Sequence, residues 1–258
     1  MISKKMEELG TTPVQIQLSD LIEMIEDEKI SRRLAYIYNQ IPKTNCGPCV
    51  KCCFVGAQVY PIEFLNIYAH LVKMPELTRT RLAKKLIEYE MLHLTTLDYS
   101  CAFLENDACI LEDQKPIACH LFGFYAESEY KKMAETSRQQ NQRLAMHFAR
   151  NSRILLPEKV MTHDVEFCAP TTDKKGNPIF ISAQERERLF QQIYSLAELV
   201  VPDDWLDPDH ERFSYQFALE FMTAEEIEKT QTKIIKEFQA KQKSPTLEKL
   251  MAEYGVHI

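Results

Sequence analysis

The chain has 258 residues, of which 45% are apolar, and a formal net charge of −7. A chain of this length and apolar content can bury a core without disulfide staples. The acidic balance argues against a nucleic-acid-binding surface, and no stretch approaches the roughly 18 uninterrupted apolar residues that a membrane span needs. Because the first residues also lack an apolar run of secretory length, we expect a cytoplasmic protein whose thiols are kept reduced.

The first third of the chain is predicted to be helical. Ser19-Asp20 is typical of a helix N-cap, and the apolar residues after it recur at helical spacing up to Pro42. Pro61 suits the first turn of a second helix. A third helix is expected from about Pro75 to Leu94.

The middle of the chain is predicted to be irregular around its cysteines. From Cys101 to Phe124 the sequence is apolar but interrupted by proline and glycine, which indicates loops and short turns. A long polar helix is expected over about Glu127 to Arg150. The turn signal at residues 174–178 predicts a short β-hairpin, in which Ile179–Ile181 would pair with Val160–Val165.

The C-terminal part is predicted to be helical. Ser182 and Thr223 each open a capping-box pattern, which predicts helices to about Val200 and about Ala240. Pro245 begins a last short helix, for which a glycine near the end of the chain fits the C-terminal stop.

These elements predict a mainly α fold with one short β-hairpin. Helical flanks at residues 1–45 and 183–258 would surround an irregular, cysteine-rich metal-binding centre at residues 46–182. We expect the three parts to form one compact unit.

The chemistry of the sequence is concentrated in eight cysteines. A Cys-x-x-Cys turn lets two thiolates reach one metal ion, and a third cysteine at the same spacing is a pattern that iron–sulfur clusters use. Clustered cysteines in a reducing compartment indicate metal binding or redox chemistry. We therefore predict eight metal ligands, which are Cys46, Cys49, Cys52, Cys53, Cys101, Cys109, Cys119 and Cys168.

The adjacent pair Cys52-Cys53 favours a polynuclear centre. Neighbouring residues rarely chelate one ion together, so the pair indicates two nearby ions, one polynuclear cluster, or one cysteine that is not a ligand. We predict an iron–sulfur cluster, with zinc as the alternative. Cys101 and Cys168 have no close cysteine neighbour and are therefore the most open to being ordinary buried thiols. Cys46-Gly-Pro-Cys49 also matches a redox dithiol turn, although the strand expected before such a turn is missing.

The order and spacing of the cysteines resemble a known family. Its elements here are Cys46 to Cys53, Cys101-Ala-Phe-Leu, Cys109, and Lys115-Pro-Ile-Ala-Cys119-His120-Leu-Phe. Over about residues 46–125 they are similar to the YkgJ-like CxxCxxCC cysteine-cluster family, described as a zinc- or iron-chelating domain, and the resemblance implies a chelated metal. Cys168-Ala-Pro resembles a later Cys-Pro element of that family. Lys115 and His120 stand where the family usually has arginine, and a weaker similarity extends to the flagellin lysine N-methylases.

Two residues beside Cys119 are candidates for catalysis. His120 could be a ligand, a proton carrier or a hydrogen-bond donor to a thiolate. Lys115 would favour deprotonated thiolates through its charge.

The predicted function is metal binding, and two alternatives stay open. One is a protein-modifying enzyme such as a lysine N-methylase built around the cluster, although the sequence lacks the glycine-rich loop of a familiar methyl-donor site. The other is a metal-handling or redox partner protein. A protein partner could use an apolar face of the C-terminal helices, although such a face more often packs on the protein's own core; that face consists of Ile227, Ile234, Ile235 and Phe238.

Overall fold

The structure is a computed structural model that describes residues 22–23, 25, 28–43, 50–95, 100–162, 165–168, 171–173, 175–202, 205–206, 212–241 and 243–254. The described part is mainly α with one two-stranded sheet, which confirms the predicted fold class. The longer helices are α3 (Glu28–Tyr38), α4 (Pro61–Val72), α5 (Glu76–Leu92), α7 (Glu127–Ser152), α9 (Ala183–Ala197), α11 (Ala224–Lys241) and α12 (Pro245–Tyr254). The shorter elements are the 3₁₀ helices η2 (Lys51–Phe54), η3 (Glu112–Gln114) and η4 (Phe122–Phe124), the α-helices α6 (Ile117–Leu121), α8 (Glu158–Met161) and α10 (Phe213–Leu219), and the strands β1 (Leu104–Glu105) and β2 (Ala108–Cys109).

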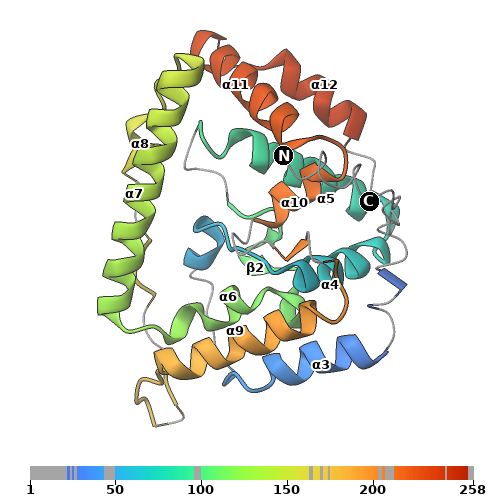
Figure 1. Ribbon diagram of the computed structural model, residues 1–258, viewed down its shortest axis with the longest axis vertical. Helices are drawn as coiled ribbons and strands as arrows, with labels where there is room; N and C mark the ends of the chain where they lie inside the picture. Colours follow the sequence, from blue (N-terminus) through green and yellow to red (C-terminus); the bar gives the residue numbers. More distant parts are fainter. Residues whose placement is uncertain are drawn as a thin grey trace, which may run out of the picture.

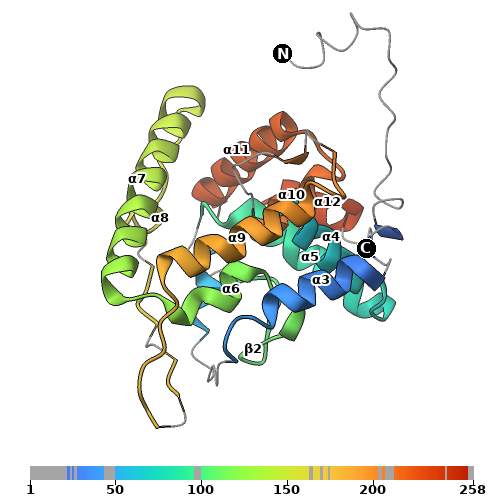
Figure 2. The same ribbon diagram turned by 60° about the horizontal axis from the view of Figure 1, so that its bottom comes forward.

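The helices form two groups with the cysteine segments between them (Figure 1). In one group α9 packs against α3 and α4, and in the other α5 packs against α10, α11 and α12. One hydrophobic cluster includes buried residues of both groups, such as Leu34, Leu65, Leu189 and Ile234. The long helix α7 stands along one side of the molecule (Figure 2). In Figure 1 the hairpin and α6 thus lie between the two groups of helices.

The helices predicted in the first third of the chain are present. The first ends at Tyr38, before Pro42, whereas its predicted start at Ser19-Asp20 lies outside the described residues. Pro61 is the first residue of α4, where its missing N–H costs no helical hydrogen bond. Helix α5 spans nearly the range predicted for it.

The β-hairpin lies at a different place from the predicted one. Strand β1 pairs with β2 through Asn106 and Asp107, whose φ angles are 49° and 59°. Positive φ at both central residues is the requirement of a type I′ turn, which matches the twist of a two-residue hairpin. The Asn-Asp pair is a sequence signal for this turn.

The pairing predicted for Val160–Val165 is wrong, because residues 158–161 form helix α8. The predicted turn is present in its described residues 175–178, where the amide of Gly176 donates to the carbonyl of Asp173 at 3.0 Å. An isolated bridge joins Thr172 to Pro178, so this segment turns back on itself and not on residues 160–165.

The caps of the C-terminal helices explain where they begin. The amide of Thr223 donates to Glu226 at 2.8 Å, and the amide of Glu226 donates to the Thr223 hydroxyl at 3.3 Å. At α9 the Ser182 hydroxyl accepts from the amide of Glu185 at 3.2 Å. Both patterns satisfy backbone N–H groups that have no intrahelical partner.

The apolar face that we considered for a protein partner is not on the surface. Ile227, Ile234 and Ile235 are almost completely buried, and Phe238 packs partly buried against the core. No helix of the described residues is both long enough and apolar enough to cross a membrane.

Candidate metal centre

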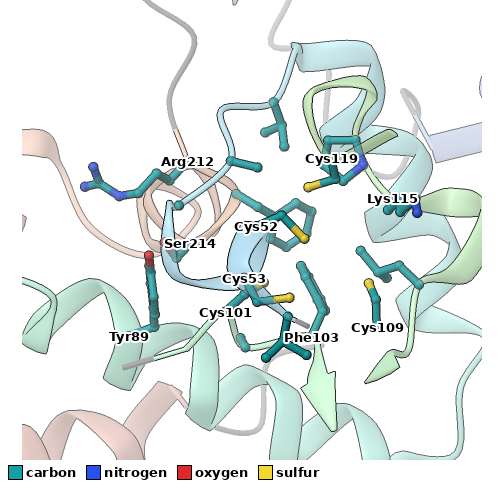
Figure 3. Close-up of a pocket in the computed structure, with 18 of the residues that line it drawn as sticks. Cys52, Cys53, Tyr89, Cys101, Phe103, Cys109, Lys115, Cys119, Arg212 and Ser214 are labelled. Carbon is teal, nitrogen blue, oxygen red and sulfur yellow. The ribbon is translucent and has the colours of Figure 1, made fainter. Parts of the chain in front are cut away.

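Five cysteines, each partly buried, line one cavity of about 550 Å³. They come from three segments that are far apart in the sequence: Cys52 and Cys53 from η2, Cys101 and Cys109 from the hairpin region, and Cys119 from α6. Figure 3 shows the sulfurs of Cys52, Cys53, Cys109 and Cys119 pointing toward a common space beside the ring of Phe103.

The segment before the cavity has an unusual backbone. Val50 precedes η2 with φ 45° and ψ 12°, a left-handed conformation that is strained for a β-branched residue. The 3₁₀ turn that follows brings both Cys52 and Cys53 to the cavity, whereas an extended chain would have separated them. Lys51 holds the turn from outside, since its ammonium lies 3.0 Å from the carbonyl oxygen of Phe167 and 3.3 Å from the carboxylate of Glu166.

Hydrogen bonds fix the hairpin against this turn. The amide of Cys101 donates to the carbonyl of Cys53 at 2.7 Å, and the amide of Leu104 donates to the carbonyl of Cys101 at 3.0 Å. Cys109 then stands opposite Leu104 in the sheet register. The short hairpin thus returns the chain so that Cys101 and Cys109 face one cavity.

A buried carboxylate positions α6. Glu63 accepts the first amide of α6, from Ile117, at 2.6 Å, and it also accepts the Tyr38 hydroxyl at 2.9 Å and the Tyr60 amide at 3.2 Å. Burial raises the pKa of Glu63 to about 7, and these hydrogen bonds only partly oppose that rise. The residue joins α3, α4 and α6 and so fixes the helix that carries Cys119. The sequence analysis missed it, because an acid in the first turn of a helix is usually only a capping group.

The thiols differ in their acidity. A hydrogen bond from Cys53, together with the charge of Lys115, lowers the pKa of Cys52 to about 6, and the same hydrogen bond and burial raise the pKa of Cys53. Burial raises the pKa of Cys101 to about 12 and that of Cys119 well above its usual value. The neighbouring thiolates add to these rises, and a metal cation would remove that repulsion.

The two candidates for catalysis face different spaces. Lys115 lines the cysteine cavity, and its charge favours the thiolate forms of Cys52 and Cys119. His120 does not line this cavity; it faces a second one, where its ring stacks on Tyr38 with centroids 4.8 Å apart. Burial, followed by the charge of Lys115, lowers the pKa of His120 to about 4, so the imidazole is neutral near pH 7.

The remaining predicted ligands stand apart from these five. Cys46 and Cys49 lie outside the described residues. Cys168 is buried but does not line the cavity; it lies near Gly123 and hydrogen-bonds Tyr130. In the part of the chain that the structure describes, no three His, Cys, Asp or Glu side chains stand close enough to hold a single metal ion.

The far wall of the cavity contains residues that the sequence analysis did not identify. Arg212, Tyr89 and Ser214 lie there (Figure 3), and Arg212 pairs with the buried carboxylate of Glu90 at 3.0 Å. Gly56 has φ +68°, and a Cβ on it would lie 2.9 Å from the Tyr89 hydroxyl, so this corner requires glycine. Arg212 and Glu90 are 122 positions apart, and Gly56 is also distant from Tyr89 in the sequence, so no local pattern predicts these contacts.

Comparison with known proteins agrees with this site. Residues 45–138 match the model of the CxxCxxCC family, described as a putative zinc- or iron-chelating domain, which confirms the resemblance inferred from the cysteine spacing. The matched region includes the five cavity cysteines and ends before Cys168. No curated protein and no solved structure matches the chain, so the similarity to the flagellin lysine N-methylases is unsupported.

Proposed function

We propose that this chain, which carries a CxxCxxCC metal-chelating domain in residues 45–138, holds an iron–sulfur cluster on thiolates of the cysteine cavity. The observation that carries the proposal is the convergence of five cysteines from three distant segments on one cavity. Such a centre would supply redox chemistry or a rigid thiolate-bound core. Cys46 and Cys49 complete the proposed ligand set through their Cys-x-x-Cys spacing.

The spacing of the thiols favours a polynuclear centre over one zinc ion. Thiolates bound to one zinc at about 2.3 Å lie within roughly 4 Å of one another. Among the described side chains no three are so close, although five thiols share the cavity. In a 4Fe–4S cluster each cysteine binds its own iron atom, so the sulfurs stand further apart. A cavity of about 550 Å³ has room for such a group. Zinc remains the alternative.

We also propose that the protein is cytoplasmic, because clustered thiols ready to bind metal require a reducing compartment.

A second function, as a protein-modifying enzyme, has one observation in its favour. The cavity extends past the sulfurs to Tyr89, Arg212 and Ser214, which leaves space for a substrate beside the metal. Titration of metal-loaded protein with S-adenosylmethionine tests the methylase version of this alternative, which the absence of binding would contradict.

The test of the main proposal is metal analysis of protein purified without oxygen. We expect brown protein that contains iron and acid-labile sulfide in similar amounts. Colourless protein with zinc alone would establish the alternative metal at the same site. Protein with neither metal would contradict both.

Isosteric variants locate the site. Cys109→Ser and Cys119→Ser each remove one thiol from the cavity, and we expect both to lose most of the metal. Cys168→Ser is the matched control, since it changes the same atom in a buried thiol outside the cavity. Equal metal loss in all three variants would contradict the assignment of the site to this cavity.

A further inference from the structure

A second cavity of about 540 Å³ lies between α3, α4 and the η3–α6 segment, and the proposed metal centre does not use it. Helix α6 separates the two spaces, because Cys119 lines the first and His120 lines the second. Lys115 and Asp113 line both. This volume is in the range of sites for small metabolites.

The charge of this cavity is opposite to that of the protein. Among the described residues, Lys43, Lys73 and Lys115 line it together with one carboxylate, that of Asp113. The whole chain carries a net charge of −7, so this local excess of cations is not an average property of the surface. Cations gathered around a concave space attract and hold an anion.

The wall of the cavity is polar, and several of its side chains are preorganised by contacts with the protein. Asn66 is buried, and its amide donates to the side chain of Gln114 at 2.6 Å, which fixes both groups at the wall. The Nε2 atom of His120 is buried and has no hydrogen-bond partner among the described residues. The stack on Tyr38 holds the imidazole in place, and the Tyr38 hydroxyl is itself bound to Glu63. A buried polar atom without a partner is unfavourable, and a ligand that hydrogen-bonds it removes that penalty.

We propose that this second cavity binds a small oxyanion, the phosphate or carboxylate group of a metabolite, through Lys43, Lys73 and Lys115, with His120 Nε2 hydrogen-bonding an adjacent polar group of the same ligand. Charge-assisted hydrogen bonds from ammonium groups to an oxyanion supply the attraction. The imidazole supplies direction, because the ring is held by its stack on Tyr38 and its Nε2 atom forms a hydrogen bond along one line.

The proposal does not depend on the identity of the metal. The cavity lies beside the thiol site, and metal content and anion binding are separate measurements on the same protein. Failure of the iron–sulfur assignment therefore leaves this proposal intact, and failure of anion binding leaves the metal site intact.

The experiment is calorimetric titration of the full chain, as isolated with its metal, with inorganic phosphate and separately with succinate. We expect one equivalent of at least one of them to bind. In Lys43→Met/Lys73→Met the dissociation constant should rise about tenfold, because two of three cations are lost. Both lysines are exposed and outside the cysteine cavity, so this variant should fold and keep its metal.

The matched control is Lys131→Met/Lys229→Met, which removes the same charge from exposed positions on α7 and α11. It should bind as the wild type does. Binding of phosphate alone identifies a phosphorylated ligand, and binding of succinate alone identifies a carboxylate. Absence of binding to both, or equal weakening in the two double variants, would overturn the proposal. His120→Phe, which keeps a ring against Tyr38, should weaken binding without removing it.

Discussion

At the scale of single residues, the burial of Glu63 makes the stability of the protein depend on pH. Its carboxyl is fully buried, and its pKa is raised from 4.5 to about 7 by that burial. The folded state therefore holds the proton more tightly than the unfolded state does. The corresponding stability is fully present below about pH 4.5 and is lost as the pH rises through about 7. A rise of this size corresponds to about 3 kcal/mol at most.

Glu63→Gln should therefore change the pH dependence of stability. The variant loses one hydrogen bond, because an amide NH₂ would face the amide of Tyr60, so we expect it to be less stable than the wild type at pH 5. The deficit should shrink, by up to about 3 kcal/mol, between pH 5 and pH 8. The lowered pKa values of His93 and His120 make stability rise with pH, opposite to the effect of Glu63. Both histidines are present in the wild type and in the variant, so the difference between the two proteins isolates the effect of Glu63.

Urea denaturation of both proteins at several pH values measures this difference. Glu76→Gln at the exposed start of α5 is the control and should follow the wild type. Parallel stability curves for wild type and Glu63→Gln would show that the buried carboxyl does not titrate in this range.

At the scale of elements, the turn of the hairpin sets the position of Cys109. Asp107 occupies the second central position with φ 59°, a conformation that aspartate tolerates and β-branched residues do not. Asp107→Val should lower the free energy of unfolding by about 1–2 kcal/mol and reduce metal content, because the strand that carries Cys109 loses its register. Asp107→Gly should be neutral or slightly stabilising.

Ala108→Val is the control for this prediction, since it adds the same side chain at the next exposed residue, which lies in β2 and not in the turn. Thermal unfolding and metal analysis of Asp107→Val, Asp107→Gly and Ala108→Val check the prediction. A loss of stability in Ala108→Val as large as in Asp107→Val would mean that bulk at the hairpin, and not the backbone of the turn, is responsible.

The sequence predicted those elements whose causes are local. Helices α4, α5 and α11 begin at proline or capping residues and continue with helical spacing, so each is specified within about twenty positions. The hairpin forms elsewhere than predicted because the Asn106-Asp107 turn, with positive φ at both residues, pairs β1 with β2, whereas Val160 lies in helix α8. Helix α8 shows that β-branched residues also occur in short helices.

The site was only partly predictable, because some of the contacts that form it are not local in the sequence. Spacing indicated metal binding, but it could not show that Cys101 joins the cavity while Cys168 stays outside. Cys101 is held at the cavity by the hydrogen bond from its amide to the carbonyl of Cys53, and Cys119 is held there by the position of Glu63 under α6. Both are long-range contacts, which no spacing rule contains.

At the scale of the whole molecule, the metal centre and the helical core contribute unequally to order. The cavity cysteines are only partly buried, and η2 has no buried residue. The apolar residues of α5, α10 and α11 form a continuous core without them. Coordination should therefore supply most of the order of residues 50–57 and part of that of residues 100–124, whose Phe103, Leu111 and Ile117 also join the core. Hydrophobic burial supplies the order of the C-terminal helices.

Removal of the metal should thus loosen one part of the molecule and leave the other folded. After chelation under anaerobic conditions we expect faster hydrogen exchange, measured by mass spectrometry, in residues 50–57 and 100–124. Exchange in α11 and α12 should stay the same, and the far-ultraviolet circular dichroism should change little, because most helical residues lie outside the loosened segments. Equal acceleration in α11 would show that the centre stabilises the entire fold. An unchanged pattern everywhere would show that the cysteine segments hold their positions through the Glu63 and Cys53 hydrogen bonds without any help from coordination.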